Sequence, residues 1–322
     1  MRLLVDRDAE LRARGIAWRI TGIASRRIGW VANPNGLDLQ LLSRDREVTT
    51  LDFPATAAGG TNVHQWLAAA RADVLFEATS LNVQSGQPAV DHLRAALEHG
   101  AHAITANKGP IVHAYADLLK LATVRGKRFL FESTVLDGIP IFSLFQENLP
   151  AIHLNGFRGI LNSTTNVILS GMEEGLAFDA ALRRAQEIGV AETDARHDVE
   201  GWDAAVKVTA LVVVLMGEKL QSADVQREGI GALTATEVRQ ARVAGTPYKL
   251  VCSARRTATG VEARVRPERV PMSDPLAWVA GTSSIVYFET DIFPGLCITE
   301  VNPGLYATAY GMLADFIRAA ES

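Results

Sequence analysis

The chain has 322 residues, enough for about two domains, since folded units contain roughly 100–200 residues each. Hydrophobic residues make up 48 % of it and charged residues 21 %, a balance that excludes a disordered, collagen-like or coiled-coil chain. The net charge of −4 offers no basic surface for a polyanion, so we expect no nucleic-acid partner.

The cysteine content and the apolar stretches predict a cytoplasmic protein. Cys252 and Cys297 cannot form a disulfide framework, and no C-x-x-C spacing is present. The first fifteen residues are too highly charged for the core of a signal peptide. The longest strongly apolar stretch, Val208–Met216, is far shorter than the roughly 20 residues that span a bilayer, so we expect no membrane contact.

The first half of the chain alternates between helical and strand patterns. We expect, in chain order, a helix over 2–14, a strand over 16–23, turns over 24–36, a strand over 74–78, a helix over 88–100, a strand over 103–105, a helix opening at 107–110 and a strand over 129–132. Strands and helices at this spacing predict an α/β domain with a Rossmann-like, doubly wound parallel sheet.

The second half has a different pattern. We expect a helix over 178–188, an acidic loop over 191–201, a long helix over 202–215, antiparallel strands over 249–254, 261–267 and 284–290, and a last helix over 306–320. This order predicts a second, α+β domain. The alternation ends near 132–140, where we place the boundary.

Lys207 is the sharpest candidate for a catalytic side chain. Asp203 precedes it by four residues, which places the two about 40° apart on one face of a helix. Val206, Val208 and Leu211 indicate that this helix is largely internal. A lysine held by a carboxylate can protonate an oxyanion that forms on a carbonyl, although the same spacing also makes an ordinary exposed ion pair.

An acidic loop precedes Lys207. Glu192, Asp194, Asp198, Glu200 and Asp203 fall within the stretch E-T-D-A-R-H-D-V-E-G-W-D, which is either a solvated loop or a set of carboxylates for a substrate ammonium. His197 has no suitably spaced second histidine, so we expect no transition-metal site there.

Polar residues also follow the strands expected in the first half. Thr79-Ser80 and Asn107-Lys108 come directly after two of them, where open α/β sheets bind ligands, and Ser25-Arg26-Arg27 follows the first. An arginine at that last place accommodates a 2′-phosphate, yet all three stretches are also consistent with plain caps and turns. No G-x-G-x-x-G motif occurs, so motif search alone does not indicate a dinucleotide site.

Several longer motifs together resemble the homoserine dehydrogenase family from about residue 16 to the C-terminus. They occur in family order, as E-A-T at 77–79, T-A-N-K-G-P at 105–110, F-E-S-T-V-L-D-G-I-P at 131–140, G-I-L-N-S-T-T-N at 159–166 and A-E-T-D-A-R-H-D-V-E-G-W-D-A-A-V-K at 191–207. The resemblance implies a nucleotide-binding domain over 1–131 that helix 303–322 completes, and a catalytic and dimerisation domain over 132–302.

The resemblance also implies an activity, which is the reversible NAD(P)-dependent interconversion of L-aspartate 4-semialdehyde and L-homoserine in threonine, methionine and isoleucine biosynthesis. It makes Lys207 the acid/base, supported by Asp203. Implied substrate-binding residues are Glu192, Asp198, Thr164 and Lys108, and implied cofactor-binding residues are Arg26, Thr79, Ser80, Lys108 and Gly304.

The same resemblance implies further ligands and partners. The cofactor is NADP, with NAD as the other possibility, and a monovalent cation, usually sodium, is bound by Glu132, Val135, Asp137 and Ile139. Family members are homodimers built through the second domain, so we expect a homodimer that acts on a small-molecule substrate.

The sequence departs from the family pattern in three places. The family begins with a strand and a glycine-rich turn, whereas this chain begins inside the following helix, so we expect a sheet without its first strand. Ser163 replaces a common glycine, and of Asn302–Ala309 only Gly304 and Thr308 match. The alternatives are a family member without dinucleotide binding, which acts as a ligand-binding or dimerisation module, and an oxidoreductase for another amino-acid aldehyde.

Overall fold

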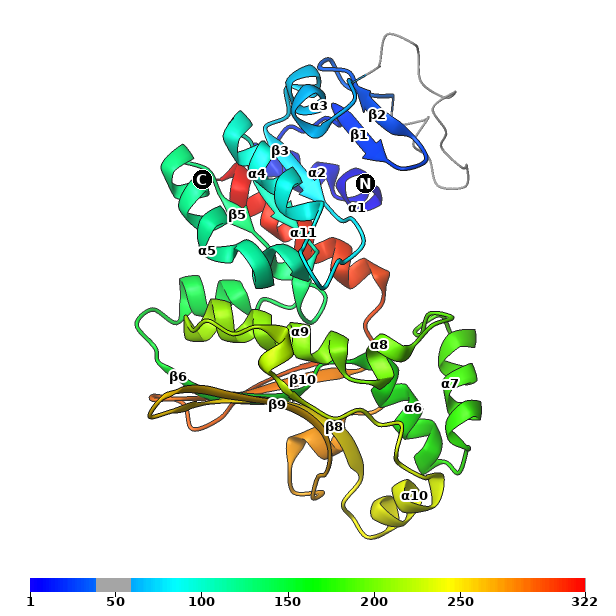
Figure 1. Cartoon of the computed structure of the whole chain (residues 1–322). Helices are drawn as coiled ribbons and strands as arrows, with labels where there is room; N and C mark the ends of the chain where they lie inside the picture. Colours follow the sequence, from blue (N-terminus) through cyan, green and yellow to red (C-terminus); the bar gives the residue numbers. More distant parts are fainter. Residues whose placement is uncertain (39–58, 322) are drawn as a thin grey trace. The chain divides into compact units, whose positions relative to one another are not determined.

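The computed structural model describes residues 1–38 and 59–321 (Figure 1). The chain divides into two compact units, the first comprising Met1–Ser133 with Thr308–Ser322 and the second Thr134–Ala307. The sequence predicts these boundaries at 131/132 and 302/303.

A parallel sheet forms the centre of the first unit. Its three strands are β3 (Val74–Glu77), β4 (His102–Thr105) and β5 (Phe129–Leu130), in the spatial order β3-β4-β5. Helices α4 (Ala89–His99) and α5 (Lys108–Arg125) connect consecutive strands. Gly100 ends α4 in the left-handed conformation with φ 87°, where a residue without a Cβ is favoured. The predicted α/β class is confirmed.

The N-terminal part of the first unit differs from the prediction. The helix expected over 2–14 is present as α1 (Arg2–Asp6) and α2 (Asp8–Ala13). The parallel strand expected over 16–23 is wrong. β1 (Gly22–Ser25) instead forms an antiparallel hairpin with β2 (Gly29–Ala32), which lies in the stretch predicted to be turns. The hairpin turns tightly because Ser25 Oγ accepts a hydrogen bond from Ile28 N (3.1 Å) and Gly29 adopts φ 74°.

Apolar side chains from distant parts of the first unit form its core. Leu11, Ile104, Leu130 and Phe316 belong to one buried cluster. Helix α3 (Val63–Ala70) packs in a second cluster, around Trp66. A cavity of about 740 Å³ lies beside β3, and its lining is mostly apolar. It includes side chains of the 16–23 stretch, of β3 and of α11 (Leu305–Ala320).

A mixed six-stranded sheet organises the second unit, with the strand order β11-β10-β6-β8-β9-β7. The strands are β6 (Leu154–Ile160), β7 (Gln226–Arg227), β8 (Tyr248–Thr257), β9 (Gly260–Arg269), β10 (Ser284–Thr290) and β11 (Leu296–Glu300). Neighbours pair antiparallel except for β7 and β9. The three predicted strands are confirmed as β8, β9 and β10, whereas β6, β7 and β11 were not predicted.

The helices of the second unit pack on or beside this sheet; Figure 1 shows α9 along one face, and α6 and α9 both contact β8. The helices are α6 (Ser163–Glu173), α7 (Phe178–Glu187), α8 (Arg196–Val199), α9 (Trp202–Leu211) and α10 (Ala235–Val243). The helix predicted over 202–215 is present as α9, which continues as a π-helical turn over Val212–Met216 until Gly217 ends it with φ 67°. Within the described ranges, no helix has the length and apolar character needed to cross a membrane.

Candidate active site

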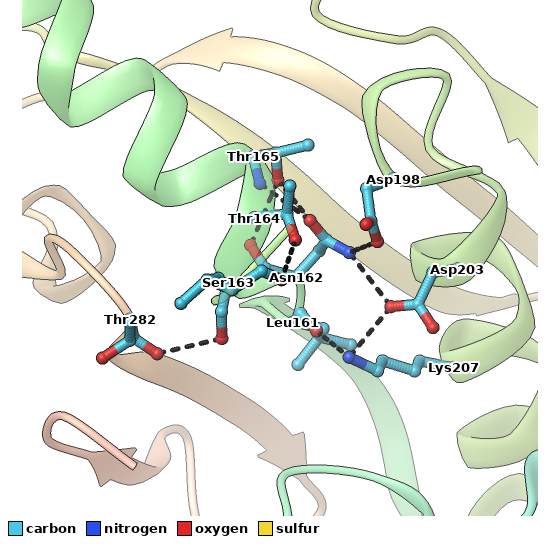
Figure 2. Close-up of polar contacts among 10 residues, drawn as sticks. Leu161, Asn162, Ser163, Thr164, Thr165, Asp198, Asp203, Lys207 and Thr282 are labelled. Carbon is cyan, nitrogen blue, oxygen red and sulfur yellow. Dashed lines mark hydrogen bonds and ion pairs between the residues drawn. The ribbon is translucent and has the colours of Figure 1, made fainter. Parts of the chain in front are cut away.

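The junction between β6 and α6 organises a cluster of charged side chains in the second unit (Figure 2). Asn162 is the N-cap of α6, where its Oδ1 accepts hydrogen bonds from the backbone N and from Oγ1 of Thr165, both at 2.9 Å. The Nδ2 of the same side chain donates to Asp198 Oδ1 (2.6 Å) and to Asp203 Oδ2 (3.0 Å). One amide therefore holds the helix end and two carboxylates.

Lys207 extends from α9 toward the same junction. Its Nζ lies 3.0 Å from Asp203 Oδ2 and donates to the backbone carbonyl of Leu161 at 2.6 Å. The Lys207 and Asp203 side chains are only 18 % and 20 % exposed, so the ion pair is largely shielded from water. The exposed alternative for this i,i+4 pair is thereby excluded.

The charges around Lys207 keep it protonated. Burial alone lowers the pKa of Lys207, but the carboxylates of Asp203, Asp198 and Asp137 together raise it above its ordinary value. Burial, followed by the charge of Asp203, raises the pKa of the Asp198 carboxyl, and the hydrogen bond from Asn162 opposes this shift. The cluster thus combines the Lys207 ammonium with the Asp203 carboxylate, which lies close to it, and with Asp198, whose carboxyl is a weaker acid than an ordinary aspartate.

Two hydroxyl-bearing residues follow Asn162 at the start of α6. Thr164 Oγ1 donates to the carbonyl of Val190 (3.1 Å). The same hydroxyl lies near Asp198 and contributes to lowering the pKa of that carboxyl. Ser163, one of the expected departures from the family pattern, donates from Oγ to the carbonyl of Thr282 (2.9 Å). Its added side chain is therefore accommodated by a partner from the loop before β10.

Glu192 lies apart from this hydrogen-bonded cluster. Glu192 is exposed in the segment between α7 and α8, and its backbone carbonyl accepts a hydrogen bond from Gln186 Nε2 (3.2 Å). Among the described contacts, the structure thus joins Lys207, Asp203 and Asp198 but does not join Glu192 to them.

A second polar network lies in the first unit, at the carboxyl ends of β3 and β4. Glu77 is only 3 % exposed, and its carboxylate accepts hydrogen bonds at both oxygens. Oε1 accepts from the backbone N (2.7 Å) and Oγ1 (2.5 Å) of Thr79, and Oε2 accepts from Thr105 Oγ1 (2.7 Å). The buried carboxylate therefore ties the end of one strand to the end of its neighbour.

Asn107 extends this network into the loop before α5. Its backbone N donates to Thr105 Oγ1 (2.9 Å), its Nδ2 donates to the carbonyl of Thr79 (3.0 Å), and its Oδ1 caps α5 by accepting from Gly109 N (2.9 Å). Thr79 and Ser80 remain exposed and Lys108 is half-buried. These residues lie at the strand ends, as the sequence predicts.

The other residues expected to contact the cofactor lie in exposed positions. Arg26 is exposed in the β1–β2 turn of the first unit. Gly304 precedes α11 in the second unit, and a Cβ added at this position would meet no atom within 4 Å, so the protein itself does not require glycine there.

The residues expected to bind a cation fall in both units. Glu132, in the first, is 3 % exposed, and its Oε2 lies 3.7 Å from Arg318 Nη1. Val135, Asp137 and Ile139 belong to the second unit, where Leu136 and Asp137 adopt left-handed conformations with φ 51° and 54°. Within the described residues, no group of three or more His, Cys, Asp or Glu side chains is arranged to bind a metal.

Sequence reasoning missed two side chains that join a strand end to neighbouring elements. Asn162 and Glu77 stand out in the sequence only as letters of longer motifs. The signal for Asn162 is an Asn directly after an apolar strand and before a helical stretch, which is typical of an N-cap. Its contacts with Asp198 and Asp203 carry no local signal, because they join residues 36 and 41 positions apart.

Two family models match the chain, and together they span most of it. The model described as homoserine dehydrogenase, NAD binding domain, matches residues 7–132, and the model described as homoserine dehydrogenase matches residues 140–317. The boundary between the two matches falls close to the division into two units.

Curated relatives and solved structures agree with these matches. An NAD(+)-dependent homoserine dehydrogenase of Pseudomonas canavaninivorans is 33 % identical over 99 % of this chain and 92 % of its own length. A homoserine dehydrogenase of Methanocaldococcus jannaschii is 37 % identical over 78 % of this chain and 74 % of its own. The crystal structure of a putative homoserine dehydrogenase from Archaeoglobus fulgidus, 29 % identical, superposes with a TM-score of 0.82 over 98 % of this chain and 93 % of that one.

The Glu77 network predicts a stability effect. The carboxylate of Glu77 accepts three hydrogen bonds, and Glu77→Gln replaces one of its oxygens by an NH2 group, which faces the donors of Thr79 or Thr105. The free energy of unfolding in urea should therefore fall by about 1–3 kcal/mol. The matched control is Glu98→Gln, at an exposed position on α4 of the same unit, which should change it by less than about 0.5 kcal/mol. Equal stability of the two variants would contradict the assigned role of Glu77.

Proposed function

We propose how the work of catalysis is divided in this chain, on the premise that it belongs to the homoserine dehydrogenase family. It is an NAD(P)-dependent oxidoreductase that interconverts L-aspartate 4-semialdehyde and L-homoserine, as its match to both domains of the family and its curated relatives support. The roles of individual residues, the preferred dinucleotide, the cation and the oligomeric state are the proposal.

Lys207 is the group that protonates the substrate oxygen. When bound, a nicotinamide dinucleotide would supply the hydride for the aldehyde carbon, which leaves the electron pair of the C=O bond on oxygen. That oxygen takes a proton from the Lys207 ammonium and becomes the alcohol of homoserine, and Lys207 then regains a proton from solvent.

The contacts of the ammonium carry this assignment. Lys207 has three N–H bonds, of which the described residues occupy two, through Asp203 Oδ2 and the Leu161 carbonyl. Those two partners fix the direction of the third N–H, which we assign to the substrate oxygen. The raised pKa of Lys207 favours the protonated form that this step requires.

The amino-acid end of the substrate is assigned to carboxylates and hydroxyls near Lys207. Asp198, held by Asn162 beside Asp203, is placed to bind the substrate ammonium, with Thr164 next to it. Glu192 joins them in the family pattern, and we propose that it reaches the ammonium only when substrate is bound. Lys108 is the remaining proposed substrate contact.

The first unit is proposed to hold the dinucleotide. Thr79 and Ser80, fixed at the end of β3 by Glu77, border the nicotinamide together with Lys108, and Gly304 lies against the cofactor. NADP is the preferred form, because the exposed Arg26 can pair with its 2′-phosphate. The relative from Pseudomonas canavaninivorans is described as NAD(+)-dependent, so NAD is the competing outcome.

A monovalent cation, sodium, completes the proposed ligand set. The left-handed pair Leu136 and Asp137 supports it, because such a backbone turns carbonyl oxygens out of a regular hydrogen-bonding pattern, and carbonyl oxygens suit a hard cation. Val135, Asp137 and Ile139 would provide these carbonyls, and Glu132 the carboxylate.

A homodimer through the second unit is the proposed assembly. Helices α6 and α9 cover one face of its sheet, while the other bears a cross-strand row that includes Arg158, Ser253 and Arg264. Arg255 and Glu289 pair on this face at 2.6 Å. Its mixture of both charges suits a two-fold interface, where each patch meets its own copy.

We also place the enzyme in the reducing cytoplasm. Cys252 is buried and Cys297 exposed, and both are free thiols, as expected where disulfides are not maintained.

Replacement of Lys207 tests its assignment. Lys207→Met should lower turnover of L-aspartate 4-semialdehyde by about 10²–10⁴-fold while NADPH affinity stays unchanged, because the proton donor is lost and the cofactor contacts are not. The measurement is nicotinamide absorbance in sodium-containing buffer, with the exposed Lys219→Met as control.

Full activity of Lys207→Met would contradict its role as the acid. A folded wild-type chain that binds L-homoserine without any turnover would contradict the enzyme assignment itself and support the alternative of a ligand-binding module.

The role of Arg26 is tested by comparing cofactors. Arg26→Ala should raise the KM for NADPH about 10-fold, since a charge-assisted contact to phosphate is lost, and leave the KM for NADH unchanged. Arg125→Ala, at the exposed end of α5, serves as the control. An equal effect on both dinucleotides, or a wild-type preference for NADH, would refute the selection of NADP by Arg26.

A further inference from the structure

Two carboxylates of the cluster around Lys207 accept hydrogen bonds from the same side-chain amide. Asp198 and Asp203 both accept from Nδ2 of Asn162, at 2.6 and 3.0 Å, as Figure 2 shows. Of these two carboxylates, Asp203 is the one that forms an ion pair with Lys207 among the described contacts, at 3.0 Å. Without the amide, two like charges would lie side by side, and both would be attracted to the same ammonium.

Asn162 is chemically suited to this place. It is 4 % exposed, its carbonyl oxygen is fixed by two hydrogen bonds from Thr165, and the fixed oxygen leaves both N–H bonds of the amide directed at the carboxylates. An ionised aspartate would offer no donor, and a serine would offer only one.

We propose that Asn162 is a positioning residue that sets the division of roles between Asp203 and Asp198. One N–H holds Asp203 where it orients the Lys207 ammonium, and the other holds Asp198 away from Lys207, so that its carboxylate is available to the substrate ammonium. The second half of this statement rests on the proposed function.

The network also explains why Asp198 does not replace Asp203 as the partner of Lys207. Lys207 is restrained from two sides, since the Leu161 carbonyl precedes Asn162 in the chain and Asp203 accepts from both Asn162 and Lys207. Residues 161 and 162 therefore act together, the backbone of the first on the lysine and the side chain of the second on the carboxylates.

Asn162→Asp tests the positioning of Asp198 and Asp203 by Asn162 separately from its role as the N-cap of α6. It is nearly isosteric, and aspartate caps helices as well as asparagine does, so α6 keeps its cap. It removes both donors and adds a third carboxylate beside Asp198 and Asp203. Asn62→Asp is the matched control, because Asn62 also caps a helix, α3, through Gln65 N (3.0 Å), outside both networks.

The first readout is kinetic. Asn162→Asp should lower kcat/KM for L-homoserine by about 10- to 100-fold, through a higher KM for L-homoserine and a lower kcat together, while the KM for the dinucleotide stays unchanged. Asn62→Asp should behave as wild type. Wild-type kinetics of Asn162→Asp would show that Asn162 only caps α6.

The second readout does not depend on activity. The charged groups that face the new carboxylate or its neighbours are Asp198, Asp203 and Lys207, and Asp137 and Glu300 interact with Lys207. The buried thiol of Cys252 also interacts with Lys207 and Asp203. Like charges raise the pKa of the new carboxyl in the folded state above its unfolded value. The loss of stability therefore begins above the unfolded pKa of an aspartate, about 3.9, and is larger at pH 8 than at pH 5.

Thermal unfolding of Asn162→Asp and Asn62→Asp between pH 5 and pH 8 measures this difference. A deficit that widens with pH in Asn162→Asp alone is expected. Equal unfolding temperatures across the range would overturn the proposal, whether or not the wild-type chain proves to be a dehydrogenase. Absence of wild-type turnover would refute only the proposed function.

Discussion

The shielded ion pair between Lys207 and Asp203 is the constraint on which the rest of the second unit depends. Removing an ammonium and a carboxylate from water is unfavourable by several kcal/mol per ion unless good geometry and further hydrogen bonds compensate. Here the compensation comes from the Leu161 carbonyl on the lysine and from Asn162 on the carboxylate. The Leu161 carbonyl at the end of β6 must therefore lie opposite Lys207 of α9, and the Asn162 cap of α6 fixes this alignment.

The first unit solves a similar problem with different groups. A buried carboxylate, Glu77, is satisfied by the hydroxyls and backbone of Thr79 and Thr105, so the ends of β3 and β4 are joined without any positive charge. In both units a polar residue at the end of a strand holds the next loop, and Thr79, Ser80, Lys108 and Thr164, which are proposed to touch ligands, lie in or beside those loops. Rigid strands thus position groups that must remain accessible.

The sequence predicted what depends on local spacing. Asp203 and Lys207 share a helix face because they are one turn apart, and the strands and helices from Val74 to Arg125 follow from apolar periodicity and from caps such as Asn107. The expected parallel strand over 16–23 failed because a short apolar run does not specify its pairing partner, and the turn at Ser25–Gly29 favours a hairpin. Asn162 was missed because its partners lie far away in sequence.

Chemical rescue of Lys207→Ala tests the central claim most directly, since the claim is that an N–H donor at this point protonates the substrate oxygen. Small alkylammonium ions such as methylammonium should restore part of the lost turnover in proportion to their concentration, whereas tetramethylammonium, which has no N–H, should not. Equal effects of the two ions, or no loss of turnover in Lys207→Ala, would contradict the account.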